Sequence, residues 1–273
     1  MTLNCKGKLL TIDSPIVMGI INITPDSFYE GSRQQSLDDI LKQTKKMLTE
    51  GAAIVDIGGQ STRPGSEAVG VEEEINRVVP AIEAICQLYP EAIVSIDTYH
   101  AAVAKAAVEA GAGIVNDVSG GTMDEQMLPT VAALKVPYIC MHMQGVPATM
   151  HLNPVYEDVT KEVLDFFIER IDACRRAGIH DVIIDPGFGF GKTIEHNFTL
   201  LKNLSLFKIL EKPILLGISR KSTIYKTLGT TAADALNGTT VLNTIGLMNG
   251  ANILRVHDVK EAVEAVKLVR RVQ

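Results

Sequence analysis

The chain contains eight short apolar runs, and each one ends toward its carboxyl side in a side chain that can hydrogen-bond or carry charge. In chain order these side chains are Asn22, Asp56, Asp97, Asn116, His142, Asp185, Ser219, and Arg255 followed by His257. Any one of them could be a helix N-cap or a turn residue, because Asn, Asp and Ser favour those positions. Eight runs in succession make that explanation poor, and the pattern predicts that these side chains gather into one site.

Positive charge is concentrated in three places along the chain. The second run leads into GGQSTRPGSE, where Arg63 offers a planar fork suited to phosphate or carboxylate; a solvated loop arginine is the alternative. The seventh run leads into residues 219–222 (SRKS), just ahead of a short helix whose N-terminal N–H groups favour anions. Arg255 and His257 stand two positions apart, so both leave the same side of a strand. Together these groups indicate an anionic ligand.

A glycine-rich segment, DPGFGFGKT, follows the sixth run. It is not a Walker A phosphate loop, since Pro186 stands where that motif needs glycine, and its spacing is not that of a dinucleotide fingerprint. Its glycines would let the backbone approach a flat ligand closely, with Phe188 or Phe190 able to cover that ligand. Asp185, at the end of the run, is the expected polar anchor beneath.

The apolar runs themselves predict a fold. They occupy residues 16–22, 53–59, 92–98, 113–120, 136–143, 181–187, 213–219 and 252–258. Such near-continuous apolar runs fit parallel strands buried on both faces, and segments with helical spacing separate them. Eight strand–helix repeats without a break in composition predict an α/β fold: a single (β/α)8 TIM barrel forming one domain over residues 1–273, with residues 2–13 as a short N-terminal cover.

An open doubly wound sheet is the structural alternative. Such a sheet usually carries a glycine fingerprint after its first strand, whereas here that strand runs into residues 22–26 (NITPD). In a barrel, the carboxyl ends of all strands meet at one mouth, where active sites of this fold are built. The barrel therefore also explains why the polar side chains recur at the strand ends.

Composition excludes several classes of function. The chain has 273 residues, 46% of them apolar, and a formal charge of −6. It has no Lys/Arg-rich block, so we expect no nucleic-acid binding. No apolar run approaches the ~20 residues that span a bilayer, so we expect no membrane association. The four cysteines lack zinc or disulfide-scaffold spacing and the N-terminus lacks a signal-peptide core, which together predict a cytoplasmic protein.

Eight segments, read together, resemble the dihydropteroate synthase family of folate biosynthesis. In family order they are MGIINITPDSF, GGQSTRPGS, SIDT, NDVSGG, MHMQG, DPGFGFGKT, GISRKS and RVHD. The resemblance extends from Ile16 to Val259. Two departures fall in loops: Tyr29-Glu30-Gly31 stands where family members often carry Ser-Asp-Gly, and Gln60 replaces a common glutamate.

The resemblance implies a transferase that condenses a 7,8-dihydropterin-6-ylmethyl diphosphate with 4-aminobenzoate, giving 7,8-dihydropteroate and diphosphate. The family's reaction is SN1-like: the bond between the pterin methylene and oxygen breaks first, and the amine then attacks the cation. The resemblance also implies Mg²⁺, linked to Asn22, and a homodimer. Sulfonamides are the family's mimics of aminobenzoate.

The family's site residues carry over position by position. A pterin pocket is implied for Asp97, Asn116, Met141, Asp185 and Lys221. Diphosphate contacts are implied for Arg63, Arg255 and His257, and for Thr62 as a broader substrate contact. Surroundings of the aminobenzoate are implied for Pro64, Phe190 and Ser219. The expected catalytic residues are Asp97, Lys221 and Arg63, and Asp97 could stabilise positive charge on the methylene.

Two other functions fit parts of the pattern. A pterin-dependent methyltransferase barrel would share the pterin pocket, but it has no need for Arg63, a Ser-Arg-Lys segment and an Arg-x-His pair around a leaving diphosphate. A non-catalytic pterin-binding module would not need every catalytic position filled, as they are here. For the homodimer, apolar positions on the C-terminal helices could contribute or could simply face the barrel. These positions are Leu236, Val241, Leu242, Ile245, Leu247 and Met248.

Overall fold

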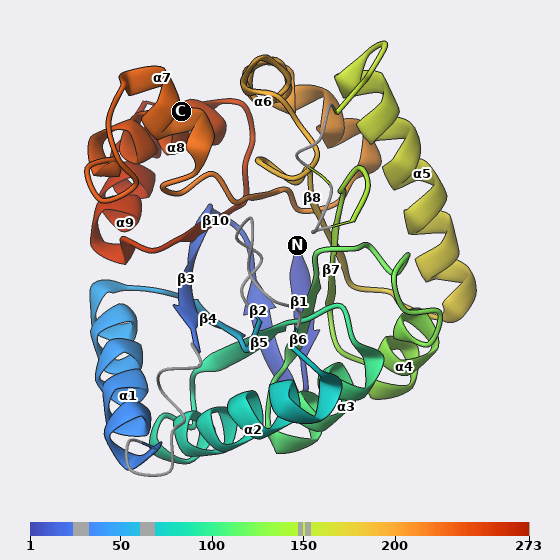
Figure 1. Ribbon diagram of the computed structural model, residues 1–273, viewed down its shortest axis with the longest axis vertical. Coiled ribbons are helices and arrows are strands. Elements are labelled where there is room, and N and C mark those ends of the chain that lie inside the picture. The colour runs from blue at the N-terminus through green and yellow to red at the C-terminus, as the bar shows by residue number, and fades with distance from the viewer. Residues whose placement is uncertain (24–32, 61–68, 147–149, 151–153, 273) are drawn as a thin grey trace.

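In the computed structural model, eight parallel strands close into a barrel that is surrounded by helices (Figure 1). The strands follow the order β8-β7-β6-β5-β4-β3-β10-β9, and every neighbouring pair is parallel. A parallel bridge between Ile184 and Ile214 joins the two ends of this sheet. The closed ring confirms the predicted TIM barrel and excludes the open doubly wound alternative.

The structure describes residues 1–23, 33–60, 69–146, 150 and 154–272. The barrel strands are β3 (Ile16–Asn22), β4 (Ile54–Gly58), β5 (Ile93–Asp97), β6 (Ile114–Asp117), β7 (Tyr138–Met141), β8 (Val182–Asp185), β9 (Leu215–Leu216) and β10 (Ile253–Val256). The helices are α1 (Arg33–Glu50), α2 (Val71–Leu88), α3 (Ala101–Ala110), α4 (Met127–Leu134), α5 (Val159–Ala177), α6 (Ile194–Lys202), the 3₁₀ helix η2 (Leu204–Leu210), α7 (Ser222–Leu228), α8 (Leu236–Met248) and α9 (Val259–Val269). Within these described ranges, no helix combines the length and the hydropathy that a bilayer crossing requires.

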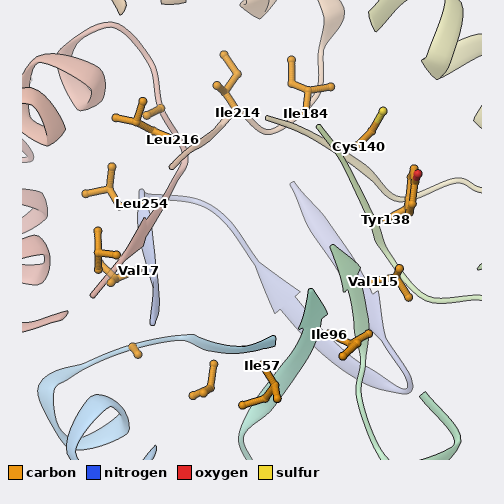
Figure 2. Packing of buried hydrophobic residues seen from close by; sticks show 14 of the residues in the cluster. Val17, Ile57, Ile96, Val115, Tyr138, Cys140, Ile184, Ile214, Leu216 and Leu254 are labelled. Carbon is orange, nitrogen blue, oxygen red and sulfur yellow. The ribbon is translucent and has the colours of Figure 1, made fainter. Parts of the chain in front are cut away.

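Side chains alternate along each strand, so one set points outward and the other into the barrel. The outward set packs beneath the surrounding helices and forms the larger core cluster. Figure 2 labels ten of its members: Val17, Ile57, Ile96, Val115, Tyr138, Cys140, Ile184, Ile214, Leu216 and Leu254. Most are β-branched or otherwise apolar, which suits strands whose outer face is covered by helices.

The inward set fills the base of the barrel with apolar side chains. This base layer consists of Met18, Ile54, Ile114, Ile139, Ile183, Leu215 and Ile253. An antiparallel hairpin of β1 (Thr2–Cys5) and β2 (Lys8–Thr11) packs on it through Leu3, Cys5, Leu10 and Ile12. The hairpin turns at Lys6 and Gly7, which have positive φ values of 54° and 89°. The predicted N-terminal cover is therefore confirmed, and it closes the base.

Helix α5 shows why the connecting segments begin and end where they do. Its N-cap Asp158 accepts hydrogen bonds from the backbone N–H groups of Thr160 (2.9 Å) and Lys161 (3.1 Å), donors that the helix itself leaves unpaired. Phe167 is fully buried in the outer core. Gly178 ends the helix at φ 92°, a left-handed conformation that glycine adopts without steric cost.

Candidate active site

The mouth of the barrel carries a polar layer above the apolar base. Strand register places Asn22 beside Gly58, Gly58 beside Asp97, and Asp97 beside Asn116. A Cβ atom built on Gly58 would lie 3.5 Å from Asn22 Oδ1 and 3.8 Å from Asp97 Oδ2, so both side chains lean over this glycine. Four neighbouring strands thus bring three of the predicted site residues together.

Two more predicted residues, Asp185 and Arg255, enter the same layer from other strands. Like Asn116, each stands two residues after an isoleucine of the base layer, and therefore shares its inward direction. These side chains therefore gather in one layer, as the pattern of strand ends predicted.

Arg255 links two carboxylates across the mouth. Its Nε donates to Asp56 Oδ2 (2.6 Å) and its Nη2 donates to Asp97 Oδ2 (2.5 Å). Burial lowers the pKa of Arg255, but the two carboxylates outweigh that effect and raise it above its ordinary value. Burial raises the pKa of Asp97, and Arg255 acts in the opposite direction. The two contacts hold the guanidinium from its Nε and Nη2 sides.

Asp185 and Lys221 bring a further carboxylate and an ammonium group to the mouth. Asp185 Oδ1 accepts the backbone N–H of Gly187 (2.8 Å). A Cβ atom on Gly217 would lie 3.5 Å from Asp185 Oδ2 and 3.9 Å from Lys221 Nζ, so both groups converge over Gly217. Burial lowers the pKa of Lys221 to about 8, with Asp185 opposing the shift; burial likewise raises the pKa of Asp185, with Lys221 opposing.

An apolar wall stands next to these charges. Met141 and Phe190 pack together with Val118 and Met150 in a small separate cluster. The Lys221 ammonium lies 4.5 Å from the centroid of the Phe190 ring and donates to the backbone carbonyl of Phe188. The glycine spacing alone left open which phenylalanine faces the ligand, and the family resemblance implied Phe190. The Phe188 side chain belongs to the outer core, so Phe190 is the one at the mouth. We term Asp97, Asn116, Met141, Asp185, Phe190 and Lys221 the mouth cluster.

Ser219 and His257 meet at the ends of β9 and β10. The Ser219 hydroxyl lies 3.0 Å from His257 Nδ1 and also accepts the His257 backbone N–H (3.2 Å). Ser219 is buried, whereas His257 is exposed and can reach a ligand at the rim. Ser219, expected near the aminobenzoate, and His257, expected at the diphosphate, are therefore direct neighbours in the structure.

His142 lies elsewhere, and its inclusion among the mouth residues is wrong. It follows inward-facing Met141 by one residue, so it points to the opposite side of the strand. There its ring packs edge-on against Phe166 (4.9 Å between centroids), and its Nδ1 lies 2.9 Å from Lys192 Nζ. Burial, and then Lys192, lower the pKa of His142 to about 2, so the ring is neutral and accepts a hydrogen bond from the lysine.

Sequence reasoning assigned no role to two buried ionisable residues that hold the site together. Asp56 was placed among the strand ends without a role, and Lys192 was not singled out at all. Lys192 Nζ donates to the carbonyls of Gly187 and Phe190 (3.0 Å each), and so fixes the glycine-rich loop. The signal for Asp56 was its place inside an apolar run: a carboxylate buried in a strand requires partners.

Thr62, Arg63 and Pro64 lie outside the described residues, and their expected roles remain predictions. For Mg²⁺, the described residues contain no group of three His, Cys, Asp or Glu side chains placed to hold a metal ion. An exposed amide oxygen such as Asn22 Oδ1 nevertheless suits this ion, which commonly takes one or two protein oxygens together with phosphate oxygens and water.

Comparison with known proteins identifies the family. The family model described as pterin binding enzyme matches residues 18–257. The chain is 44% identical to the dihydropteroate synthase of Escherichia coli K12 over 271 residues, which cover 98% of this chain and 95% of that protein. The chain belongs to the dihydropteroate synthase family. The resemblance in the sequence motifs is thereby confirmed.

Solved structures of family members agree with the fold. The dihydropteroate synthase of Yersinia pestis in a sulfonamide drug complex superposes with a TM-score of 0.92 at 41% identity, covering 100% of this chain and 98% of that one. The Xanthomonas albilineans dihydropteroate synthase with 4-aminobenzoic acid gives the same TM-score, identity and coverage. The barrel and its N-terminal hairpin therefore belong to a dihydropteroate synthase architecture.

Proposed function

We propose that the protein is a transferase of folate biosynthesis. It condenses 7,8-dihydropterin-6-ylmethyl diphosphate with 4-aminobenzoate to give 7,8-dihydropteroate and diphosphate. The observation that carries this proposal is the mouth cluster, in which acidic and amide acceptors, one lysine and an apolar wall converge at the carboxyl ends of the strands in a member of this family. The four cysteines are free thiols, which supports our proposal that the reaction takes place in the cytoplasm.

The mouth cluster suits a flat, neutral, donor-rich ring such as the pterin. Asp97, Asn116 and Asp185 supply acceptors for its ring N–H and amino groups, and Lys221 supplies a donor for its carbonyl or ring nitrogens. Met141 and Phe190 give the ring apolar faces to lie against. Together these groups hold the pterin so that its methylene carbon faces the open mouth.

The reaction breaks one bond before it forms another. The methylene–oxygen bond breaks, the electron pair leaves with the diphosphate, and positive charge develops on the pterin methylene. Asp97 stabilises that charge, while Arg63, Arg255 and His257 stabilise the negative charge that grows on the diphosphate. The aniline nitrogen then forms the new C–N bond and loses a proton to solvent. No general base is required for the attack, because an aromatic amine is already neutral at pH 7.

Mg²⁺ fits this scheme at the diphosphate. Asn22 Oδ1 lies beside Gly58 at the rim and would hold the ion together with diphosphate oxygens and water. When bound, the ion supplies charge neutralisation for the leaving diphosphate.

The aminobenzoate lies, in our proposal, on the outer side of the pterin. Ser219, Phe190 and Pro64 surround it, and Thr62 adds a substrate contact. The family structures that hold 4-aminobenzoic acid and a sulfonamide drug support this assignment, and they make this protein a sulfonamide target in our proposal.

Diphosphate release with and without 4-aminobenzoate tests the function. We expect release that depends on aminobenzoate, together with stoichiometric formation of dihydropteroate by mass spectrometry. A pterin-dependent methyltransferase would release no diphosphate, and a non-catalytic module would bind the pterin without turnover. Either result would refute the proposal.

The homodimer is a further part of the proposal. Of the six apolar positions considered on α8, Leu247 is buried, Leu236 and Leu242 are half-buried, and three are exposed in one stripe: Val241 (48%), Ile245 (41%) and Met248 (50%). Such a stripe is the part of the helix able to meet a second copy. Light scattering of the wild type and of Ile245→Glu tests this: we expect a dimer that the charge converts to a monomer, and a monomeric wild type would overturn it.

A further inference from the structure

We propose that Asp56 is a positioning residue. It orients Asn116, which belongs to the pterin pocket, and Arg255, which contacts the diphosphate. The inference rests on the proposed function and adds to it a residue that touches no substrate. Asp56 lies in the middle of β4 and faces into the barrel, two residues after Ile54 of the base layer.

One oxygen of Asp56 serves both partners. Asp56 Oδ2 accepts from Asn116 Nδ2 at 3.0 Å and from Arg255 Nε at 2.6 Å. The residue is 0% exposed, and its other oxygen, Oδ1, is buried without a hydrogen-bond partner among the described residues. A carboxylate kept in this position, with one oxygen left unsatisfied, is costly for the fold and points to a role in the site.

For Asn116, the consequence is a fixed amide orientation. An ionised carboxylate only accepts hydrogen bonds, so the Asn116 amide must turn its Nδ2 toward Asp56. Its Oδ1 is then the atom left to face a ligand. Asp56 thereby makes Asn116 an acceptor in the mouth cluster, which matches a pterin edge composed of N–H and amino donors.

For Arg255, the consequence is a fixed plane. Asp56 on Nε and Asp97 on Nη2 hold the rigid guanidinium from two sides, so that the Nη1 edge is presented in one direction. Asp56 also compensates the charge of Arg255. Asp97 therefore does not have to neutralise that cation by itself, and its carboxylate can respond to positive charge on the pterin methylene.

A double-mutant cycle tests the inference. The readout is the Kd of a pterin analogue without a diphosphate, measured by calorimetry on the full chain. We expect Asp56→Ala to weaken binding by roughly tenfold or more, since small displacements of binding groups have large effects. In an Asn116→Ala background, Asp56→Ala should weaken binding of the analogue little further. Of the two side chains that Asp56 orients, only Asn116 contacts this diphosphate-free ligand, and that side chain is already removed. In an Asp185→Ala background it should keep its full effect. Additive effects in both backgrounds, or equal coupling in both, would overturn the proposal.

Two further variants separate positioning from stability. Asp56→Asn keeps one oxygen for both donors, so its Kd should lie between those of the wild type and Asp56→Ala; if Asp56→Ala does not fold, the same cycle is run with Asp56→Asn. Asp117 is the matched control, a fully buried carboxylate on the outward side of β6 that accepts from Tyr138 Oη (2.7 Å). Asp117→Asn should lower the Tm without changing the Kd of the analogue. If the Kd followed the Tm in all variants, Asp56 would be structural only.

The steady-state parameters distinguish this inference from the proposed function. If the wild type forms no dihydropteroate, the proposed function fails. If the wild type is active but Asp56→Ala leaves both the KM for the pterin diphosphate and the analogue Kd unchanged, only the inference fails. We expect an active wild type and a variant whose KM for the pterin substrate rises while its KM for 4-aminobenzoate changes little.

Discussion

At the scale of single residues, carboxylates at the mouth of the barrel use their two oxygens for different contacts. Asp185 is one of them: its Oδ1 accepts the backbone N–H of Gly187, which leaves Oδ2 above Gly217 for the pterin. In Asp185→Asn the amide oxygen can keep the Gly187 contact, but an NH₂ group then faces a pterin donor. We expect a loss of about 1–3 kcal/mol in the binding of a diphosphate-free pterin analogue, with an unchanged Tm for the free protein. An unchanged affinity would show that Asp185 only caps its turn.

Glu74 on α2 is a second buried acid, and it predicts a pH dependence of stability. It is 1% exposed. Burial raises its pKa to about 7; the Thr98 side chain and Arg77 oppose this shift, and Asp97 adds to it. Because this folded pKa lies above the unfolded one, the stabilisation from the bound proton is fully present at pH 4 and is lost as the pH rises through about 7.

Glu74→Gln removes that titration. We expect the variant to gain free energy of unfolding relative to the wild type between pH 5 and pH 8, by up to about 3 kcal/mol, measured by urea denaturation at both pH values. Glu73→Gln is the control, since its side chain is 55% exposed, although it pairs with the buried Arg77. A difference that is the same at both pH values would contradict the prediction.

Much of the site could be predicted residue by residue because side-chain direction follows a period of two along a strand. That rule finds Asp97, Asn116 and Asp185 once the runs are identified. It fails for His142, because an error of one residue in where a strand ends reverses the face. The partners of Arg255 could not be predicted, since Asp56 lies 199 residues away in the chain and no local pattern joins them.

At the scale of elements, the glycine-rich loop after β8 is fixed by two lysines from either side. Lys192 donates to the carbonyls of Gly187 and Phe190, and Lys221 donates to that of Phe188. The loop must also pass close to β7: a Cβ atom on Gly187 would lie 1.8 Å from the carbonyl oxygen of His142, and its φ is 70°. The loop therefore has little freedom, which keeps Phe190 at the mouth.

Lys192→Met tests this element. The methionine fills a similar volume but leaves the loop carbonyls without their donor, so we expect a loss of about 1–3 kcal/mol in unfolding free energy. Hydrogen exchange in residues 186–192 should become faster, and pterin affinity should fall. Lys202→Met, at an exposed position on α6, is the control and should change neither quantity. Unchanged exchange in the loop would show that the lysine is not what holds it.

The elements were also the level at which sequence prediction worked best. All eight runs became strands of one barrel, since long β-branched runs separated by helical segments leave few other topologies. The glycine pattern alone did not decide between Phe188 and Phe190; only the family resemblance pointed to Phe190. Gly187, Gly189 and Gly191 all have positive φ in that loop, so no strand or helix period relates neighbouring side chains there.

At the scale of the whole molecule, the N-terminal hairpin should contribute to stability without affecting catalysis, because it lies at the end of the barrel away from the mouth. Leu10 is 8% exposed and packs on the base layer, at the end of the barrel opposite the mouth, whereas Leu9 beside it is 73% exposed. We expect Leu10→Ala to lower the unfolding free energy by about 2–4 kcal/mol while kcat at 25 °C stays within twofold. Leu9→Ala should change neither. A large loss of kcat in a folded Leu10→Ala protein would contradict this prediction, since it would mean that packing at the base affects the geometry of the mouth.

The pairing of Asp56 with Arg255 has a consequence for how the chain is made. A ribosome adds roughly 5–20 residues per second, so the 199 residues between them take on the order of 10–40 s to synthesise. Throughout that interval the nascent chain contains Asp56, in its second barrel strand, but does not yet contain Arg255, the cation that pairs with it. A partly finished barrel that enclosed this acid would leave it with the Asn116 amide but without its cation. We therefore expect burial of the barrel interior to be complete only when the last strand has been made.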